Sequence, residues 1–77
     1  MPATNAAAEA FRNEVARNEG PVIIAELPTD NGHVVFTVNS SAANLVPILY
    51  HKGFALQAGA KNGVPTVVAY ANPGRSV

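Results

Sequence analysis

Two kinds of hydrophobic spacing alternate along this chain, and their order limits the folds that it can adopt. Between residues 4 and 19, apolar residues recur at three- and four-residue intervals, which predicts an amphipathic helix. The recurring residues are Ala8, Phe11 and Val15. Thr4 or Asn5 can cap the start of this helix. Gly20 and Pro21 end it, because glycine tolerates the left-handed closing conformation and proline cannot continue a helix.

Four further runs are rich in β-branched and aromatic residues, which favour extended strands. The runs are residues 22–27, 33–39, 54–59 and 65–71. Residues 28–32, with the sequence Pro-Thr-Asp-Asn-Gly, have the composition of a tight reversal between the first two runs. Residues 60–64 join the last two runs and contain Asn62-Gly63, a strong short-range hairpin signal. The pattern therefore predicts two β-hairpins.

A second helix is predicted between the two hairpins, with Gly53 closing it. If the helix began at Ser41, Pro47 would remove an interior hydrogen bond. If Asn44 capped it instead, Pro47 would fall in the first turn, where that bond is not made. We therefore expect a short helix from about residue 44 to Lys52, preceded by an irregular segment.

The order of these elements, αββαββ, predicts an α+β fold. We expect a four-stranded antiparallel sheet with two helices on one face, because each amphipathic element must bury its apolar side against another layer. Residues 1–77 should form a single domain, since the chain is well within the size of one. Residues 1–3 and 73–77 are expected to be loose termini.

The two halves of the chain show a weak similarity to each other. A shift of 33 residues superposes Gly20 on Gly53 and Val35 on Val68. These residue types are common, so chance matches to an αββ pattern explain the similarity as well as duplication does. A true αββ repeat would relate the two halves of the sheet by an approximate two-fold axis.

The chain is short for a fold without covalent cross-links. A domain of 77 residues hides only about 60% of the surface that its unfolded chain exposes, and the sequence contains no cysteine. Hydrophobic residues make up 48% of the chain and charged residues only 13%, with a formal net charge of zero. Such a surface gives little electrostatic protection against association. We therefore expect a homodimer or higher oligomer, and binding to another protein as well.

Strand alternation divides the predicted sheet into two faces. The face expected to point toward the helices is almost wholly apolar. It comprises Ile23, Ala25, Leu27, Val34, Phe36, Val38, Phe54, Leu56, Ala58, Val67, Ala69 and Ala71. The other face, which includes Glu26 and His33, is mixed and too apolar for a surface left in water. We expect it to be an interface centred on Val22, Ile24, Val35, Val68 and Tyr70.

Catalytic and cofactor signatures are scarce in the sequence. His33 and His51 are the only histidines, and neither has a second ligand at metal-binding spacing, so we expect no metal and no cofactor. Glu26 and His33 flank the first hairpin on the same predicted face, where they would form a small polar site or a structural pair. The segment 59–63 lacks the glycine spacing and the ending of a phosphate-binding loop. A non-enzymatic role is favoured.

Charge is distributed unevenly, although it sums to zero. Residues 1–38 contain all five acidic residues and two arginines, and residues 39–77 contain only Lys52, Lys61 and Arg75. These three basic residues are the candidate contacts for a polyanion. Binding to a phosphate backbone normally needs more Lys and Arg on one face, so nucleic-acid binding is expected to be weak.

The sequence thus predicts a small non-enzymatic protein–protein interaction protein that acts as a homo-oligomer through an apolar sheet face. One alternative is a structural subunit of a larger assembly, such as a viral particle. Another is a weak nucleic-acid-binding regulator that uses the C-terminal basic residues. No apolar run approaches the roughly 18 residues that span a bilayer, and no secretory signal is recognised, so no membrane association and a cytoplasmic location are expected.

Overall fold

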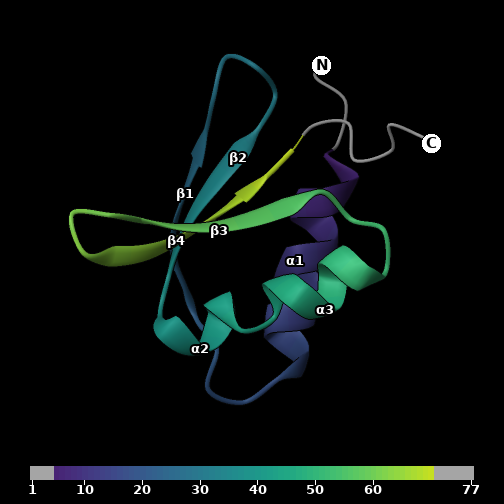
Figure 1. Ribbon diagram of the computed structural model, residues 1–77, viewed down its shortest axis with the longest axis vertical. Coiled ribbons are helices and arrows are strands. Elements are labelled where there is room, and N and C mark those ends of the chain that lie inside the picture. The colour runs from purple at the N-terminus through teal and green to yellow at the C-terminus, as the bar shows by residue number, and fades with distance from the viewer. Residues whose placement is uncertain (1–4, 71–77) are drawn as a thin grey trace.

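The computed structural model describes residues 5–70 and has the predicted αββαββ order, with the second helical region divided in two. Its elements are α1 (Ala6–Arg17), β1 (Ile23–Pro28), β2 (Val34–Val38), α2 (Ser40–Ala43), α3 (Val46–His51), β3 (Leu56–Lys61) and β4 (Val64–Ala69). The four strands form one antiparallel sheet in the order β1-β2-β4-β3, and the helices cover one of its faces (Figure 1). The predicted α+β fold is confirmed. The loose termini predicted at 1–3 and 73–77 lie outside the described residues.

Asn5 starts α1 and also ties it to the sheet. Its side-chain oxygen accepts hydrogen bonds from two backbone amides of the first turn, at 3.0 and 3.2 Å, which is the expected capping role. Its side-chain nitrogen donates to the carbonyl oxygen of Gly32 at 3.2 Å and to that of Ala69 at 3.1 Å. Of the two expected caps, Asn5 is the one used among the described residues, and Thr4 lies outside them.

The second helical region consists of two short helices, because Pro47 interrupts it. Proline has no N–H, so it cannot donate to the carbonyl of Ala43 four residues earlier, and α2 ends there. Asn39 caps α2 by accepting from the Ala42 amide at 3.0 Å. Pro47 lies in the first turn of α3, as predicted, but Asn44 is not the cap, since the residue before α3 is Leu45 and makes no side-chain capping bond.

The β3–β4 hairpin turns through Asn62 and Gly63, as the sequence predicts. Their φ angles are 53° and 80°, the left-handed values that a two-residue turn with the right twist requires. Lys61 pairs with Val64, so both strands continue up to the turn and are longer there than expected. Ala71, which is predicted to end the fourth strand, lies outside the described residues.

The pairing of the two central strands, β2 and β4, is symmetric about Val35 and Val68. These two residues face each other, and the flanking pairs are Val34 with Ala69 and Phe36 with Val67. A shift of 33 residues converts positions 34, 35 and 36 of β2 into positions 67, 68 and 69 of β4. Each pair is thereby mapped onto a pair of the same set, as an internal two-fold axis requires. The hairpins differ, because Leu27 pairs with Val35 whereas Gln57 pairs with Val68, and residues 27 and 57 are 30 positions apart. The internal repeat remains a prediction.

The hydrophobic core lies between the helices and the two central strands. Phe11 of α1 and Phe36 of β2 are fully buried, with ring centroids 5.0 Å apart. Small residues on α1, Ala7 and Ala8, are also fully buried and let the helix approach the sheet closely. Most residues predicted to face the helices lie in this core or against it: Ile23, Val34, Phe36, Val38, Phe54, Leu56, Val67 and Ala69.

A bulge in β1 changes which residues face the helices. The register shifts between Ile23 and Ala25, so two residues of β1 oppose one of β2 and the alternation of faces moves by one. Ala25 pairs with Thr37 and Leu27 pairs with Val35, which places both β1 residues on the face without helices. The prediction that Ala25 and Leu27 point toward the helices is therefore wrong, because a shift of one residue turns a strand over.

The same bulge moves Glu26 to the helix side of the sheet, where it pairs with Phe36 across the strands. There Arg12 of α1 reaches it, and Nε of Arg12 donates to both carboxylate oxygens at 2.9 and 3.0 Å. The guanidinium also lies 5.6 Å from the centre of the Phe36 ring. The prediction of Glu26 on the other face is corrected accordingly, and its partner is an arginine of the first helix.

Candidate interaction surface

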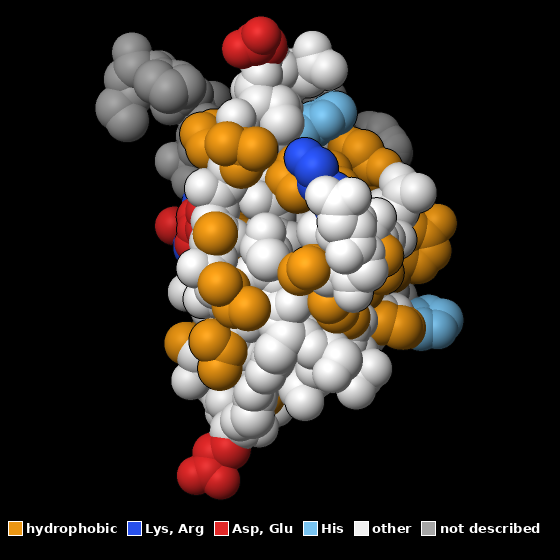
Figure 2. Space-filling model, turned by 90° about the vertical axis from the view of Figure 1, so that its left-hand side faces the viewer, with side chains coloured by type: hydrophobic (Ala, Val, Ile, Leu, Met, Phe, Trp, Pro, Cys, Tyr) orange, Lys and Arg blue, Asp and Glu red, His pale blue; other side chains and the backbone are white. Residues whose placement is uncertain are grey.

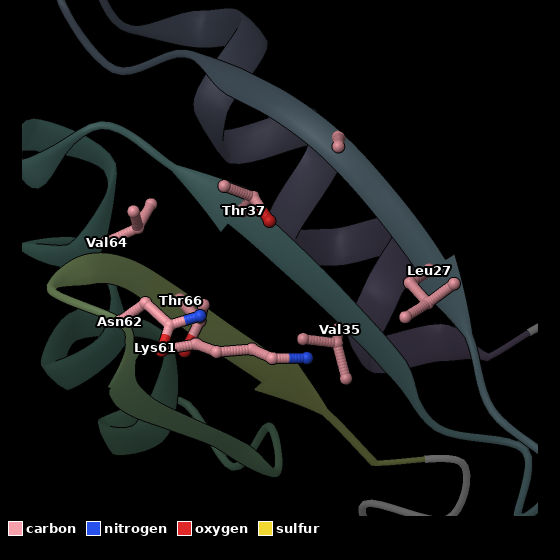
Figure 3. A pocket seen from close by; sticks show the side chains of 8 residues that line it. Leu27, Val35, Thr37, Lys61, Asn62, Val64 and Thr66 are labelled. Carbon is pink, nitrogen blue, oxygen red and sulfur yellow. The ribbon is translucent and has the colours of Figure 1, made fainter.

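The face of the sheet that carries no helix contains a groove of about 240 Å³ (Figure 3). We call this face the open face. The groove lies between the β1–β2 hairpin and the tip of the β3–β4 hairpin, which curls over the open face. Its walls include Ala25, Leu27, Val35, Lys61, Val64 and Thr66. The pairing of β2 with β4 ends at Thr37 and Thr66, so the β3–β4 turn extends beyond the part of the sheet in which these two strands are bonded.

The walls of this groove are largely apolar and accessible. Leu27 on one side is 61% exposed and Val64 on the other is 41% exposed. Val35, on the central strand β2, is half-buried. Hydrophobic side chains form a column along this side of the molecule, and charged side chains are sparse among them (Figure 2). A contiguous apolar surface of this kind is typical of a binding site.

Lys61 provides the one positive charge in the groove lining. It ends β3, and its side chain extends over the groove toward Val35 (Figure 3). Among residues 5–70, no carboxylate forms a salt bridge with it. Two threonine hydroxyl groups, of Thr37 and Thr66, also line the groove. The groove can therefore hold an apolar group and one negatively charged or hydrogen-bonding group, and it lacks the second titratable group that acid–base chemistry needs.

The predicted interface residues fall into three places. Val35 and Val68 face each other at the centre of the open face, and both are half-buried. Val22 and Ile24 are 52% and 65% exposed and lie at the opposite end of β1 from its hairpin turn. Tyr70 follows β4 and is half-buried. The structure thus brings Val35 and Val68 together and leaves Val22, Ile24 and Tyr70 at the margins of the open face.

Tyr70 has polar and aromatic neighbours that make it less available than its position suggests. Its hydroxyl donates to the side-chain oxygen of Gln57 on β3. The ring of His33 packs against it edge to face, with ring centroids 4.9 Å apart. His33 is therefore held by Tyr70, whereas Glu26 is held by Arg12, and the predicted meeting of Glu26 and His33 does not occur.

Leu27 and Val64 are surface residues of the groove that the sequence pattern does not predict. A regular first strand places Leu27 on the helix side, and the pattern predicts Val64 within the connection 60–64. The Asn62-Gly63 signal could have located Val64, since a two-residue turn places it at the first position of the following strand. Nothing in the sequence of β1 marks the bulge, so Leu27 could not have been found.

The predicted polyanion contacts do not form a patch in the part of the chain that the structure describes. Lys52 follows α3 in the helix layer, and Lys61 lies at the far end of β3. A strand of six residues separates their ends of the sheet, which corresponds to about 20 Å. Arg75 lies outside the described residues. Two isolated lysines do not provide the continuous positive surface that a phosphate backbone requires.

Within residues 5–70, no three His, Asp or Glu side chains are close enough to hold a metal ion. None of the helices in that range has the length and apolar character needed to cross a membrane. Comparison of the chain with protein families, with curated proteins and with solved structures gives no match.

Proposed function

We propose that the protein is a small, non-enzymatic interaction module that forms a homo-oligomer through its open face. The observation that supports this is the apolar groove, whose walls Leu27 and Val64 remain exposed on a face that no helix covers. Burial of apolar surface stabilises an association by roughly 25 cal/mol per Å². A chain that hides only part of its apolar surface internally gains by covering such a groove with a second molecule.

The second molecule proposed here is another copy of the same chain. The net charge of the chain is zero, so two copies do not repel each other at long range. Among residues 5–70, Lys61 is the only charged residue that lines the groove, and its long side chain keeps its amino group in water while its stem covers apolar surface. Use of the same surface by a different protein, including neighbours in a larger assembly, is compatible with this chemistry and is the second candidate.

We propose binding rather than catalysis on the same grounds, and we keep a cytoplasmic location as the expectation from the sequence. The groove has a single ionisable side chain, whereas general acid–base chemistry uses two groups that converge on a substrate. Nucleic-acid binding is the least favoured function, because Lys52 follows α3 in the helix layer and Lys61 lies at the far end of β3.

The test compares molar mass in solution for two double variants. In Val35→Glu/Val68→Glu, two carboxylates at the centre of the open face should lower the oligomeric state, because charges in an apolar interface remain unpaired. The control, Ile48→Glu/Tyr50→Glu, adds the same charge at exposed positions of α3. Light scattering across a concentration series measures both. An unchanged mass for a folded open-face variant contradicts the proposal.

Because Val35 and Val68 are half-buried, a second variant avoids their packing. Leu27→Glu/Val64→Glu changes two exposed groove residues, so its far-ultraviolet circular dichroism should match that of the parent chain. If this variant keeps the parent's oligomeric state, the groove is not the contact between copies.

A further inference from the structure

The two edges of the sheet are built differently. The β1 edge has three features that hinder pairing with another strand: the bulge after Ile23, the charged side chain of Glu26, and Pro28, which has no N–H to donate. The β3 edge has none of these between Gln57 and Ala60. Natural sheets protect exposed edges with such features, so the stretch from Gln57 to Ala60, which carries none of them before Lys61 ends the strand, points to a use for β3.

The backbone of β3 presents a short row of unpaired groups. The amide of Tyr70 donates to the carbonyl of Ala55 at 3.0 Å. Ala55 and every second residue after it along β3 therefore bond inward to β4. Alternation along an antiparallel strand then directs the N–H and C=O groups of Ala58 and Ala60 away from the sheet. Every residue from Gln57 to Lys61 is exposed, so no helix or loop among the described residues covers this row.

The side chains along this edge allow another backbone to approach closely. The sequence from 58 to 60 is Ala-Gly-Ala, with no branched or charged side chain. In an antiparallel pair, residues at a non-hydrogen-bonded position approach to about 4.5 Å between Cα atoms. Gly59 permits this approach, and a small side chain would fit there too, since directly opposed residues hold their Cβ atoms about 4.5 to 5.5 Å apart.

We propose that β3 pairs antiparallel with β3 of a second copy, about a two-fold axis that passes between the two Gly59 residues. In this register, Ala58 of each copy exchanges two hydrogen bonds with Ala60 of the other, which satisfies all of their outward groups. A register centred on Ala58 would instead use the amide of Leu56, which already donates to the carbonyl of Phe54 at 3.2 Å. The edge is complementary to itself, so a second copy is the partner that fits.

This pairing extends the sheet to eight strands and has a consequence for the open face. A two-fold axis between antiparallel strands is perpendicular to the sheet, so both copies place their helices on one side and their open faces on the other. The two apolar grooves then share one continuous surface. Edge pairing and open-face binding are separate contacts, and each can occur without the other.

The first test uses the absence of cysteine from the chain. A single cysteine in Gly59→Cys would lie next to its counterpart at the two-fold axis, whereas Tyr50→Cys carries an equally unique thiol on α3, 67% exposed. Under mild oxidation we expect the first variant to form a covalent dimer at least ten times faster than the second. A Cβ at Gly59 contacts Thr66 at an acceptable 3.4 Å, so the variant should fold. Equal rates for the two variants overturn the proposal.

The second test removes one outward donor. Ala58→Pro deletes an N–H that makes no bond to β4, a position at which an edge strand tolerates proline. If both contacts between copies form, light scattering should show that this variant has half the molar mass of the parent. Loss of mass in Ala58→Pro with no loss in Leu27→Glu/Val64→Glu supports edge pairing and contradicts the open-face proposal. The reverse result overturns edge pairing alone, and a monomeric parent chain overturns both.

Discussion

Arg12 and Glu26 join the first helix to the edge strand β1 through an ion pair in which Nε of the arginine bonds to both carboxylate oxygens. The pair exists only because the bulge turns Glu26 toward the helices. The two side chains are 40% and 37% exposed, so water screens much of their attraction. The guanidinium has a second role, since it also covers part of the Phe36 ring.

We expect the Arg12→Ala variant to lose more stability than Glu26→Ala, because only the arginine also packs on Phe36. A double-mutant cycle between the two positions should give a coupling free energy of about 0.2 to 1 kcal/mol at low salt. That coupling should shrink at high salt, whereas the contribution of the arginine stem to packing should not. Urea unfolding of the four chains measures both quantities. Equal losses in the single variants would show that the ring contact contributes nothing.

Asn5 combines a helix cap with two long-range hydrogen bonds, and two substitutions separate these roles. Asn5→Ser keeps a capping oxygen but loses the side-chain N–H groups that reach Gly32 and Ala69. It should cost about 1 to 2 kcal/mol, because each of the two bonds usually contributes about 0.5 to 1.5 kcal/mol and one of them is exposed. Asn5→Ala loses the cap as well and should cost about 2 to 3 kcal/mol. Urea unfolding followed by circular dichroism gives both values. A serine variant as stable as the parent would leave Asn5 as a cap only.

The turn between β3 and β4 depends on the backbone of Gly63. Its φ angle of 80° is unfavourable for residues with a side chain, although a Cβ there would meet no atom within 4 Å. Gly63→Ala should therefore cost about 1 to 2 kcal/mol from backbone strain alone. The matched control is Asn62→Gly, which keeps a residue that accepts positive φ and should change the free energy of unfolding by less than about 1 kcal/mol. Similar losses in both variants would contradict this assignment.

Elements encoded by neighbouring residues could be predicted from the sequence. The Asn62-Gly63 turn depends on local backbone preferences and occurs where expected, with φ angles of 53° and 80°. The helix stop predicted at Gly20 is wrong, because α1 ends at Arg17 and its C-cap, Asn18, is already extended. The αββαββ order follows from local hydrophobic spacing in the same way. The centre of the open face was also predictable, since Val35 and Val68 lie in strands without irregularities.

Features set by contacts between distant residues could not be predicted. The bulge in β1 depends on its pairing with β2, and the Arg12–Glu26 pair depends on the bulge. The groove forms only when the second hairpin curls over the sheet, which no single segment encodes. For the same reason, the separation of Lys52 and Lys61 could not be predicted, because it is a property of the folded chain.

The bond from Asn5 to the carbonyl of Ala69 places the entry and exit points of the described fold side by side. A short linker could therefore connect these points without crossing the sheet, with new ends opened in the five-residue connection between Pro28 and Val34. The fold is thus suited to circular permutation, and a permuted chain would retain every strand pairing, although β1 and β2 would then lie at opposite ends of the sequence instead of forming a hairpin.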